Sequence, residues 1–404
     1  MSQLPLRVLV IGGGLGGLCL AQGLRKAGIS VAVYERDSEP SARNQGYRVH
    51  IDTHGEQALR ECLPPSLYEL FLATRGQESK GLTVFSVVDG QLKEVATRRF
   101  PGSGSSEFVT VGSAVDRLTL RQVLLAGLDD VVHFGKEFTR YEQQHDGTIR
   151  ACFADGTSAT GDVLVAADGV GSRIREQFLP HAEVIDTGVR WLGGKTVLTN
   201  ELRALLPTQL VETFGSVPGV AQSMVFGLVA FRQDPNQAAA HLWPGLRFHN
   251  TVDYVFWGVL AQQHLFAVSD DELNAMPGPD LQRLVLAVSV DRPRTLRTLI
   301  EQCQPDQTFV LRIRHAKPIE HWQTTNITLL GDAIHVMPPN GSGANTALRD
   351  ASLLSRSLIA VARQGMPLHQ ALHDYEIEML RYGFDAVHTF RQGGGPGSPF
   401  TPTR

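Results

Sequence analysis

The sequence predicts an α/β protein that combines a parallel-sheet domain, an interleaved antiparallel sheet and long C-terminal helices. Near the start, an apolar run, a glycine-rich turn, a helical stretch and a second apolar run follow one another within residues 7–35. Near the end, residues 344–363 and 368–387 carry apolar residues at helical spacing. In between, long β-rich segments are interrupted by two short helical stretches. The expected strands are 190–199, 223–231, 254–260 and 308–316, and the helical stretches are 270–275 and 280–287.

The composition excludes several classes of protein. The 404 residues allow two or three domains, and 42% hydrophobic with 19% charged residues is typical of a chain that folds around a core. The 37 basic and 41 acidic residues give a net charge of −4, so nothing favours nucleic acid as a partner. No run approaches the roughly 20 apolar residues of a membrane span, and the four cysteines lack disulfide-rich or zinc-binding spacing. We expect a cytoplasmic protein without a metal site or a membrane span.

The first 35 residues contain a glycine fingerprint between two strands. The first apolar run leads into the sequence GGGLGG at 12–17, and the second ends at Glu35. In such a Rossmann-like βαβ unit, Gly12 permits the tight turn, Gly14 lets the backbone approach a pyrophosphate and Gly17 lets helix and strand pack closely. The helix N-terminus attracts phosphate, and Glu35 is placed to accept from ribose hydroxyls. The unit predicts a dinucleotide ligand, either FAD or NAD(P).

Two further segments place an aspartate directly after a buried strand. Asp168 follows the apolar run Val163–Ala166 and opens the sequence DGVGSRIR, while Asp332 lies in the sequence GDAIH after a second apolar run. Ligands of open α/β sheets bind beyond the carboxyl ends of the strands. Together with the glycine turn, the two aspartates suggest one extended ligand that crosses several strand ends.

The order of these motifs resembles that of the class A flavoprotein monooxygenases, the para-hydroxybenzoate hydroxylase group. The chain has GxGxxG with a later Glu, then DGxxSxxR, then GDAxH followed by GxGxN. The resemblance spans residues 5 to about 390, and the layout is most similar to salicylate-hydroxylase-like and tetracycline-inactivating members. It implies FAD as the bound dinucleotide and NADPH or NADH as the reductant.

The resemblance also implies roles for residues at matching positions. Arg117 opens an Arg-x-x-Leu helix start whose arginine reaches FAD, and Asp332 would accept from the ribityl chain. Pro338 or Pro339 would lie near the flavin, and Arg48 would contact FAD or substrate. No catalytic side chain is assigned, because the flavin supplies the oxygen chemistry. The predicted cofactor-binding residues are Gly12, Gly14, Leu15, Gly17, Glu35, Arg36, Arg48, Arg117, Asp168, Asp332, Gly343, Ala344 and Asn345.

Two strands of the expected antiparallel sheet are apolar on both faces. A half-exposed strand would alternate apolar and polar residues, so both faces of 223–231 and 254–260 must be covered. One face can pack on the protein's own core, and the other can roof a wide apolar cavity over the flavin. The candidate substrate contacts are Met224, Phe226 and Phe256, and the pattern leaves open which face meets the flavin.

These patterns divide the chain into interleaved parts. We expect a discontinuous FAD-binding domain, a β-sheet domain for substrate, C-terminal helices and a flexible tail. The expected boundaries are 1–75, 101–180 and 317–350 for the FAD-binding domain, 76–100 and 181–316 for the substrate domain, 351–390 for the helices and 391–404 for the tail.

By resemblance, the protein is a monooxygenase of secondary metabolism and a monomer or homodimer. Such an enzyme uses NAD(P)H and O2 to hydroxylate or epoxidise a bulky, electron-rich aromatic or polycyclic small molecule through a flavin C4a-hydroperoxide. Two alternatives are a flavin-dependent reductase or dehydrogenase of the same fold, and an FAD protein that sequesters a ligand. The sequence does not identify the substrate, and it does not distinguish NADH from NADPH as the reductant.

Overall fold

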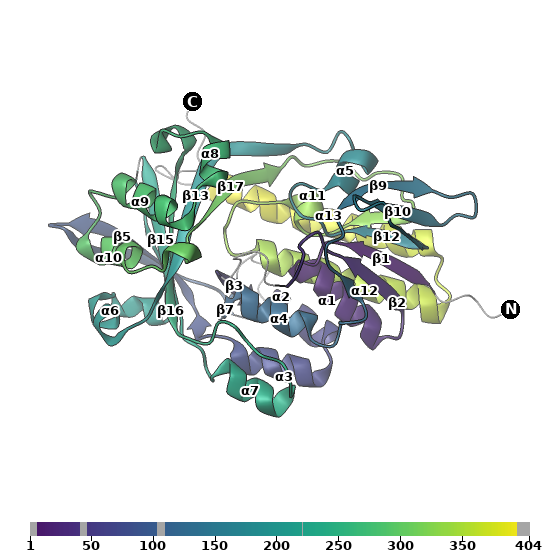
Figure 1. Ribbon diagram of the computed structural model, residues 1–404, viewed down its shortest axis with the longest axis horizontal. Coiled ribbons are helices and arrows are strands. Elements are labelled where there is room, and N and C mark those ends of the chain that lie inside the picture. Colours follow the sequence, from purple (N-terminus) through teal and green to yellow (C-terminus); the bar gives the residue numbers. More distant parts are fainter. Residues whose placement is uncertain (1–5, 41–46, 103–109, 220, 394–404) are drawn as a thin grey trace.

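The chain folds into two halves that lie side by side (Figure 1). The computed structural model describes residues 6–40, 47–102, 110–219 and 221–393. One half contains the N-terminal strands and the C-terminal helices, and the other is built around a large sheet from the middle of the chain. The predicted α/β class, with a parallel-sheet domain and a separate β-sheet domain, is confirmed.

A five-stranded parallel sheet organises the first half. Its strand order is β18-β12-β1-β2-β8, and every neighbouring pair is parallel. Distant parts of the chain therefore meet in one sheet, as the βαβ pattern and the two later apolar runs predict. The strands are β1 (Arg7–Ile11), β2 (Ser30–Tyr34), β8 (Val132–His133), β12 (Val163–Ala166) and β18 (Ile327–Leu329).

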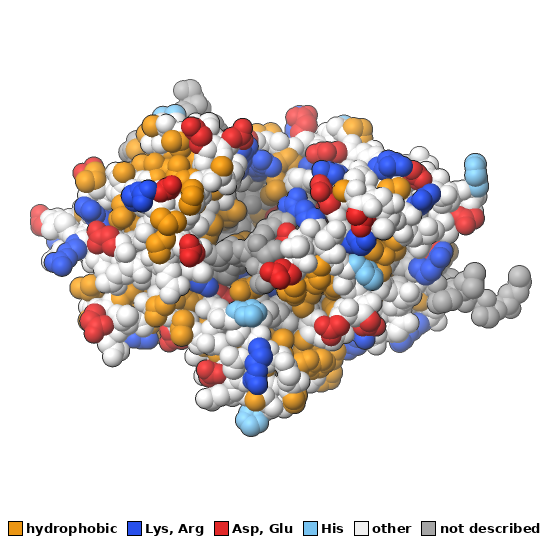
Figure 2. All heavy atoms as spheres, in the orientation of Figure 1, with side chains coloured by type: hydrophobic (Ala, Val, Ile, Leu, Met, Phe, Trp, Pro, Cys, Tyr) orange, Lys and Arg blue, Asp and Glu red, His pale blue; other side chains and the backbone are white. Residues whose placement is uncertain are grey.

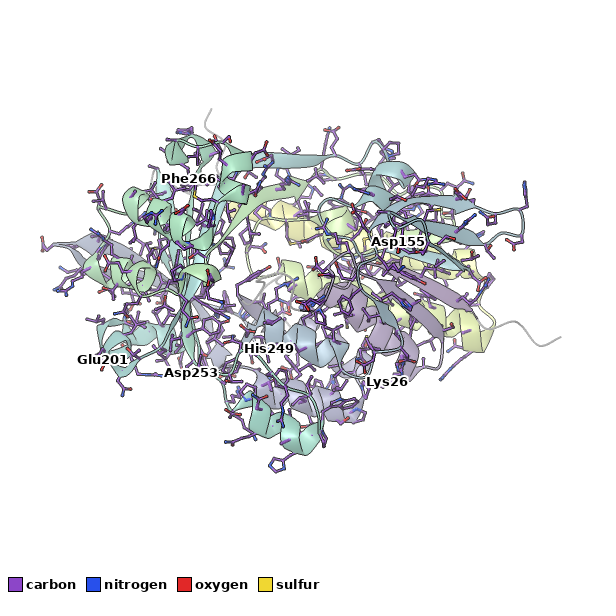
Figure 3. The ribbon with its side chains drawn as sticks, in the orientation of Figure 1. Lys26, Asp155, Glu201, His249, Asp253 and Phe266 are labelled. Carbon is purple, nitrogen blue, oxygen red and sulfur yellow. The ribbon has the colours of Figure 1, made fainter. Side chains whose placement is uncertain are left out.

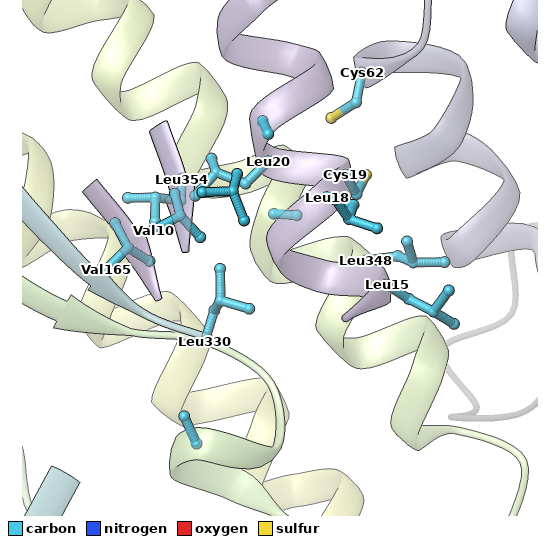
Figure 4. Packing of buried hydrophobic residues seen from close by; sticks show 14 of the residues in the cluster. Val10, Leu15, Leu18, Cys19, Leu20, Cys62, Val165, Leu330, Leu348 and Leu354 are labelled. Carbon is cyan, nitrogen blue, oxygen red and sulfur yellow. The ribbon is translucent and has the colours of Figure 1, made fainter. Parts of the chain in front are cut away.

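Apolar helices pack against this sheet and against each other. In Figure 4, Val10 and Val165 of the sheet lie beside Leu20 of α1 and Leu354 of α12, all of them buried. Burying each such side chain stabilises the fold by roughly 1.5–3 kcal/mol. The helices of this half are α1 (Leu15–Lys26), α2 (Thr53–Cys62), α3 (Pro65–Thr74), α4 (Arg117–Leu125), α5 (Arg173–Phe178), α11 (Asp332–His335), α12 (Gly343–Gln364) and α13 (Leu368–Gly393).

A seven-stranded sheet organises the second half. Its order is β17-β13-β16-β15-β14-β5-β6, and its pairs are antiparallel except for the parallel pair β14 and β5. The strands are β5 (Gly81–Val88), β6 (Gln91–Arg99), β13 (Val184–Val197), β14 (Thr213–Val217), β15 (Gln222–Val229), β16 (Tyr254–Gln262) and β17 (Phe309–Ala316).

Helices cover one face of this sheet. A second core contains Phe226 and Trp257 of the sheet with Leu296 of a covering helix, and Phe266 belongs to the same core (Figure 3). The helices of this half are α6 (Asn200–Leu205), α8 (Asp270–Ala275), α9 (Gly278–Val288) and α10 (Arg294–Glu301), with single 3₁₀ turns at Thr208–Val211, Gln263–Phe266 and Pro305–Gln307. Helix α7 (Pro235–Leu242) packs beside α3 on the core of the first half. The separate helix α10 and the strand β14 were not predicted.

Two small antiparallel sheets complete the described structure. Their orders are β3-β7-β4 and β11-β10-β9. The strands are β3 (Arg48–Asp52), β4 (Glu78–Ser79), β7 (Gly112–Asp116), β9 (Phe138–Gln143), β10 (Ile149–Phe153) and β11 (Ser158–Gly161).

The structure corrects one expected element and extends another. The sequence of residues 131–138 has a pattern typical of one strand, but that prediction is wrong, because the chain turns at Gly135 with a φ of +70° between β8 and β9. Helix α13 continues to Gly393, and residues 394–404 of the expected tail lie outside the described residues. Among the described helices, none is both long and apolar enough to cross a membrane.

Candidate active site

The predicted cofactor residues meet at one edge of the parallel sheet. Ile11 pairs with Tyr34 of β2 and with Ala166 of β12, and Ala166 pairs with Leu329 of β18. The carboxyl ends of these neighbouring strands are therefore level, where ligands of open α/β sheets bind. The residues that follow these ends are Gly12, Glu35, Ala167 with Asp168, and Leu330 with Gly331 and Asp332.

The glycines of the turn meet different requirements. Gly12 has a φ of +113°, and a Cβ there would lie 2.2 Å from the Ala167 carbonyl oxygen. A Cβ on Gly17 would lie 2.2 Å from the Gly12 carbonyl oxygen, so only glycine lets α1 approach the turn this closely. A Cβ on Gly14 would meet nothing within 4 Å. Gly14 caps α1, Leu15 is its first residue, and the open space before this helix N-terminus fits a pyrophosphate.

Glu35 ties the end of β2 to the glycine turn. Its Oε2 accepts from the Gly13 N–H at 2.7 Å and its Oε1 from the Asp37 N–H at 2.9 Å. A carboxylate has further lone pairs, so Glu35 can also accept from a ribose hydroxyl. Arg36, the next residue, is exposed. The unpredicted Arg121 of α4 donates from Nε to the Gly13 carbonyl at 3.0 Å and braces the same turn.

The two aspartates at the strand ends fit a hydroxyl-bearing ligand. Asp168 Oδ1 is buried without a hydrogen-bond partner among the described residues, and burial raises the pKa of this carboxyl. The Asp332 side chain is accessible to solvent. The protein atoms around it nevertheless raise the pKa of its carboxyl, because their effect outweighs the lowering of this pKa by His335 and Arg117. The Asp332 carboxyl is therefore accessible to a ligand even though protein atoms surround it. Hydroxyl donors from a ribityl chain or ribose would satisfy both groups.

A buried network holds the turn that carries Asp332. Asp350 Oδ2 accepts from the Gly331 N–H at 2.7 Å and lies 2.6 Å from His335 Nε2, while Tyr382 donates to Asp350 Oδ1 at 2.5 Å. Burial alone would lower the pKa of His335, but the Asp350 carboxylate outweighs it and the pKa is raised. Asp350 was not predicted, because it lies within α12 outside every motif. Its one sequence signal is a charge among the apolar residues of that helix.

The N-terminus of α12 faces the site through its backbone. Asn345 Oδ1 accepts from the Asp52 N–H at 3.0 Å, and its Nδ2 donates to the His50 carbonyl at 2.8 Å. The side chain is thus occupied in joining α12 to β3. Gly343, Ala344 and Asn345 can therefore offer backbone N–H groups, as the sequence predicts, and this helix end has no side-chain cap.

Arg117, the first residue of α4, interacts with both Tyr47 and Asp332. Its guanidinium lies over the Tyr47 ring, 5.5 Å from the centroid, and its charge lowers the pKa of Asp332. Of the two prolines expected near the flavin, Pro338 is buried and Pro339 is exposed.

Arg48 faces the second half of the molecule. Its Nε donates to the Leu228 carbonyl at 3.3 Å, its Nη2 donates to Ser79 Oγ at 3.0 Å, and its guanidinium lies 4.8 Å from the Phe214 ring centroid. Of the two roles expected for Arg48, these contacts favour the substrate side.

The seven-stranded sheet has two different faces. Met224 and Phe226 are fully buried on the face that α9 and α10 cover. Phe256 packs on the other face with Tyr254 and with Ala114 of β7. We call this second face the chamber face; Figure 2 shows a recess between the two halves. Its residues are Trp191, Lys195, Phe214, Val225, Gly227, Val229, Tyr254, Phe256, Gly258 and Phe309.

The substrate prediction therefore needs a correction. Met224 and Phe226 are core residues beneath helices and do not reach the chamber face, because alternate residues of a strand point to opposite sides. Phe256 is on the chamber face, where its ring is buried among other aromatic residues, and its contact with substrate stays a prediction.

Asp116 joins the chamber face to the first half. Its Oδ2 accepts from the Tyr254 hydroxyl at 2.9 Å and from Asn250 Nδ2 at 2.7 Å, and its Oδ1 accepts from the Thr119 N–H at 2.8 Å. Figure 3 shows the neighbouring His249 where the two halves meet. The contact fixes the sheet relative to the helix that begins with the predicted FAD-binding arginine.

Comparisons with known proteins agree with this architecture. A model described as an NAD(P)-binding Rossmann-like domain matches residues 10–62, and a model described as an FAD binding domain matches residues 299–389. An FAD-dependent monooxygenase of Emericella nidulans is 30% identical over 377 residues, which cover 88% of this chain and 87% of that protein. The chain belongs to the FAD-dependent monooxygenases. The predicted family and the FAD cofactor are confirmed, and the matched domains also support a nicotinamide reductant.

Solved structures extend the family comparison to the fold. A putative FAD-containing monooxygenase from Photorhabdus luminescens subsp. laumondii TTO1 is 32% identical with a TM-score of 0.79, over 98% of this chain and 100% of that one. A 2,6-dihydroxypyridine-3-hydroxylase from Arthrobacter nicotinovorans shares the fold at 18% identity, with a TM-score of 0.76 over 100% and 95% of the two chains.

The monooxygenase family also includes longer proteins. A dual O-methyltransferase/FAD-dependent monooxygenase of Cercospora beticola is 33% identical over 392 residues, which cover 92% of this chain. The chain spans only 44% of the length of that relative.

Proposed function

We propose that the protein is an FAD-dependent monooxygenase that uses NAD(P)H and O2 to hydroxylate or epoxidise a bulky, electron-rich aromatic or polycyclic small molecule. The observation that carries the proposal is the position of the chamber face. This aromatic surface packs against Ala114 and Tyr47 of the half that holds the predicted FAD-binding residues. A ring bound on it would lie beside the half that holds those residues.

Bound FAD would supply the redox chemistry with O2, and the chain would hold it in place. The turn at Gly12 to Gly17 would bind the pyrophosphate, Glu35 the adenosine ribose and Asp332 the ribityl chain. The N-terminus of α12 would place N–H groups and the positive end of its dipole beside the flavin ring, where they stabilise negative charge.

The chamber face is suited to orienting a flat substrate. Trp191 and Phe256 meet edge to face with centroids 5.7 Å apart, and Phe214 and Phe256 stack at 6.3 Å. A Cβ on Gly258 would lie 1.8 Å from the indole nitrogen of Trp191, so glycine lets this indole lie close against the sheet. Such aromatic surfaces bind rings and exclude water from the reacting atoms.

We also propose that the two halves divide the work as the sequence predicts. The FAD-binding domain would comprise 1–75, 101–180 and 317–350, and the substrate domain 76–100 and 181–316. The pairing of β5 with β14 supports the assignment of 76–100 to the substrate domain.

Oxygen consumption tests the proposed function. FAD-loaded protein is mixed with NADPH or NADH and with electron-rich naphthols, and O2 uptake, NAD(P)H oxidation and incorporation of ¹⁸O from ¹⁸O2 are followed together. A monooxygenase gives ligand-stimulated O2 uptake and labelled product. NAD(P)H-dependent reduction of the ligand without ¹⁸O would indicate a reductase, and tight binding without turnover would indicate a sequestering protein.

A further inference from the structure

Two cations reach the chamber face without a carboxylate partner in the described part of the chain. Lys195 of β13 has neither a hydrogen bond nor an ion pair from its ammonium there, and lies 5.4 Å from the Tyr254 ring centroid. Among the described residues, the polar and ring contacts of the Arg48 guanidinium are with neutral groups, namely the Leu228 carbonyl, the Ser79 hydroxyl and the Phe214 ring.

The strand register places the two cations on either side of one aromatic residue. Lys195 pairs with Phe256, and Phe256 pairs with Gly227 on the next strand. Arg48 Nε lies 3.1 Å from the position a Cβ on Gly227 would take. Neighbouring strands are about 4.8 Å apart, so the row of Lys195, Phe256 and Arg48 spans roughly 10 Å. This span is comparable to that of a fused-ring molecule.

Nearby groups do not neutralise this row. Burial and the Asp116 carboxylate raise the pKa of Tyr254 well above its ordinary value, so its phenol stays neutral. Burial likewise raises the pKa of the Cys303 thiol, which donates to the Lys195 carbonyl. The Asp116 carboxylate raises the pKa of Lys195, but among the described residues it makes no ion pair with that ammonium, and both of its oxygens already accept from Thr119, Tyr254 and Asn250.

Holding these two charges away from water is costly. Burial lowers the pKa of Lys195, and it lowers the pKa of Arg48 to about 10. Elsewhere on the same strand the chain avoids this cost, because the buried Arg190 is paired with both Asp186 and Asp270. Lys195 and Arg48 are only half-buried, so a charged ligand can reach them and supply the partner that they lack among the described residues.

We propose that Lys195 recognises an ionised oxygen, a carboxylate or a phenolate, on the aromatic substrate of the chamber face, while Arg48 lies at the other end of the same ring system. Lys195 is the specificity-determining residue, since its ammonium has no other hydrogen-bonding role among the described residues. The inference rests on the proposed function for the identity of the site, but ligand binding tests it without turnover.

Equilibrium dialysis of the FAD-loaded protein against matched probes provides the test. The probes are 2-naphthoate and 2-naphthamide, which differ in charge but hardly in shape, and a nitro-substituted naphthol whose phenol ionises near neutral pH, measured at pH values below and above its ionisation. The variants are Lys195→Met, Lys195→Arg as the charge-conserving replacement, and Lys317→Met as a control, because Lys317 is an exposed lysine paired with Glu183. FAD content is measured for each variant.

We expect the unmodified protein to bind an anionic probe at least about tenfold more tightly than its neutral counterpart, the range of a hydrogen bond to a charged group. Lys195→Met should reduce that preference to about threefold or less, whereas Lys195→Arg and Lys317→Met should retain it. A preference for naphthoate alone selects a carboxylate, and tighter binding of naphthol only above its ionisation selects a phenolate. Equal binding of charged and neutral probes, no binding of any anionic probe, or a preference that survives in Lys195→Met overturns the inference.

Failure of the proposed function gives a different result. Anion-selective binding that depends on Lys195, with no ligand-stimulated O2 uptake, would retain this recognition site and reject the monooxygenase reaction. Turnover in which NAD(P)H oxidation is coupled to product, but without any preference for anionic ligands, would retain the monooxygenase reaction and reject the recognition site.

Discussion

The two halves of the molecule place their functional groups in different ways. In the first half, the predicted cofactor residues follow directly after strands, so the register of one parallel sheet brings Gly12, Glu35, Asp168 and Asp332 to the same edge. In the second half, the residues of the chamber face come from the middles of strands, and no motif marks them. What distinguishes them from the core residues beside them is the face of the sheet to which they point.

This difference shows why one site is predictable and the other is not. A turn that binds pyrophosphate needs particular residues next to one another in the sequence. A sheet face needs only alternate apolar residues, and here both faces satisfy that requirement. Helices α9 and α10 cover one face, so the other is left to the chamber.

Gly14→Val should give the largest effect in the cofactor half. A Cβ at this position meets no protein atom but enters the space in which the pyrophosphate would bind, so FAD binding should fall at least about 100-fold. The apoprotein should unfold at nearly the unmodified temperature. Gly17→Ala is the matched contrast, since its Cβ would clash with the Gly12 carbonyl and should destabilise the apoprotein itself. Normal FAD content in Gly14→Val would reject the assignment of the turn.

Alanine substitutions on opposite faces of β15 separate the two roles of the sheet. Phe226→Ala removes a fully buried ring from the helix-covered core and should lower the free energy of unfolding by about 3–5 kcal/mol. Val225→Ala, on the chamber face, should cost only about 1 kcal/mol and should change substrate KM and the coupling of NADPH oxidation to product. Denaturant unfolding measures the free energy of unfolding, and steady-state kinetics measure KM and the coupling. Equal stability losses with unchanged kinetics would place the substrate elsewhere.

Asp332→Ala tests one predicted hydrogen bond in the cofactor half, the bond between the Asp332 carboxylate and the ribityl chain of FAD. Loss of a hydrogen bond to a charged group costs about 1.5–3 kcal/mol, so FAD affinity should fall at least about tenfold. Retention of FAD through gel filtration and titration of the apoprotein measure this change. If FAD affinity is unchanged, Asp332 does not accept from the ribityl chain.

Asp332→Asn should have the smallest effect of these substitutions. It should stabilise the apoprotein slightly. Burial raises the pKa of the Asp332 carboxyl, so the folded state binds its proton more tightly than the unfolded state, and the ionised carboxylate reduces stability above that pKa. Replacing it with a neutral amide should raise the melting temperature at pH 7 by about 1–2 °C. The gain should shrink as the pH falls through the raised pKa of this carboxyl, because the unmodified protein then becomes protonated and neutral as well. A lower melting temperature for the variant at pH 7 would contradict this account.

The sequence by itself determined the class of fold, the FAD-binding family and the positions of the glycine turn and the two strand-end aspartates. These features depend on backbone geometry over a few residues, so their spacing is visible in the chain. The tertiary structure decided which face of the second sheet is core, and therefore that Met224 and Phe226 lie beneath helices while Phe256 does not. It also decided that Asp350 holds the Gly331 turn and that Arg48 points away from the strand ends. These outcomes depend on packing between different elements, some of them more than a hundred residues apart in the chain. No local pattern in the sequence encodes such contacts.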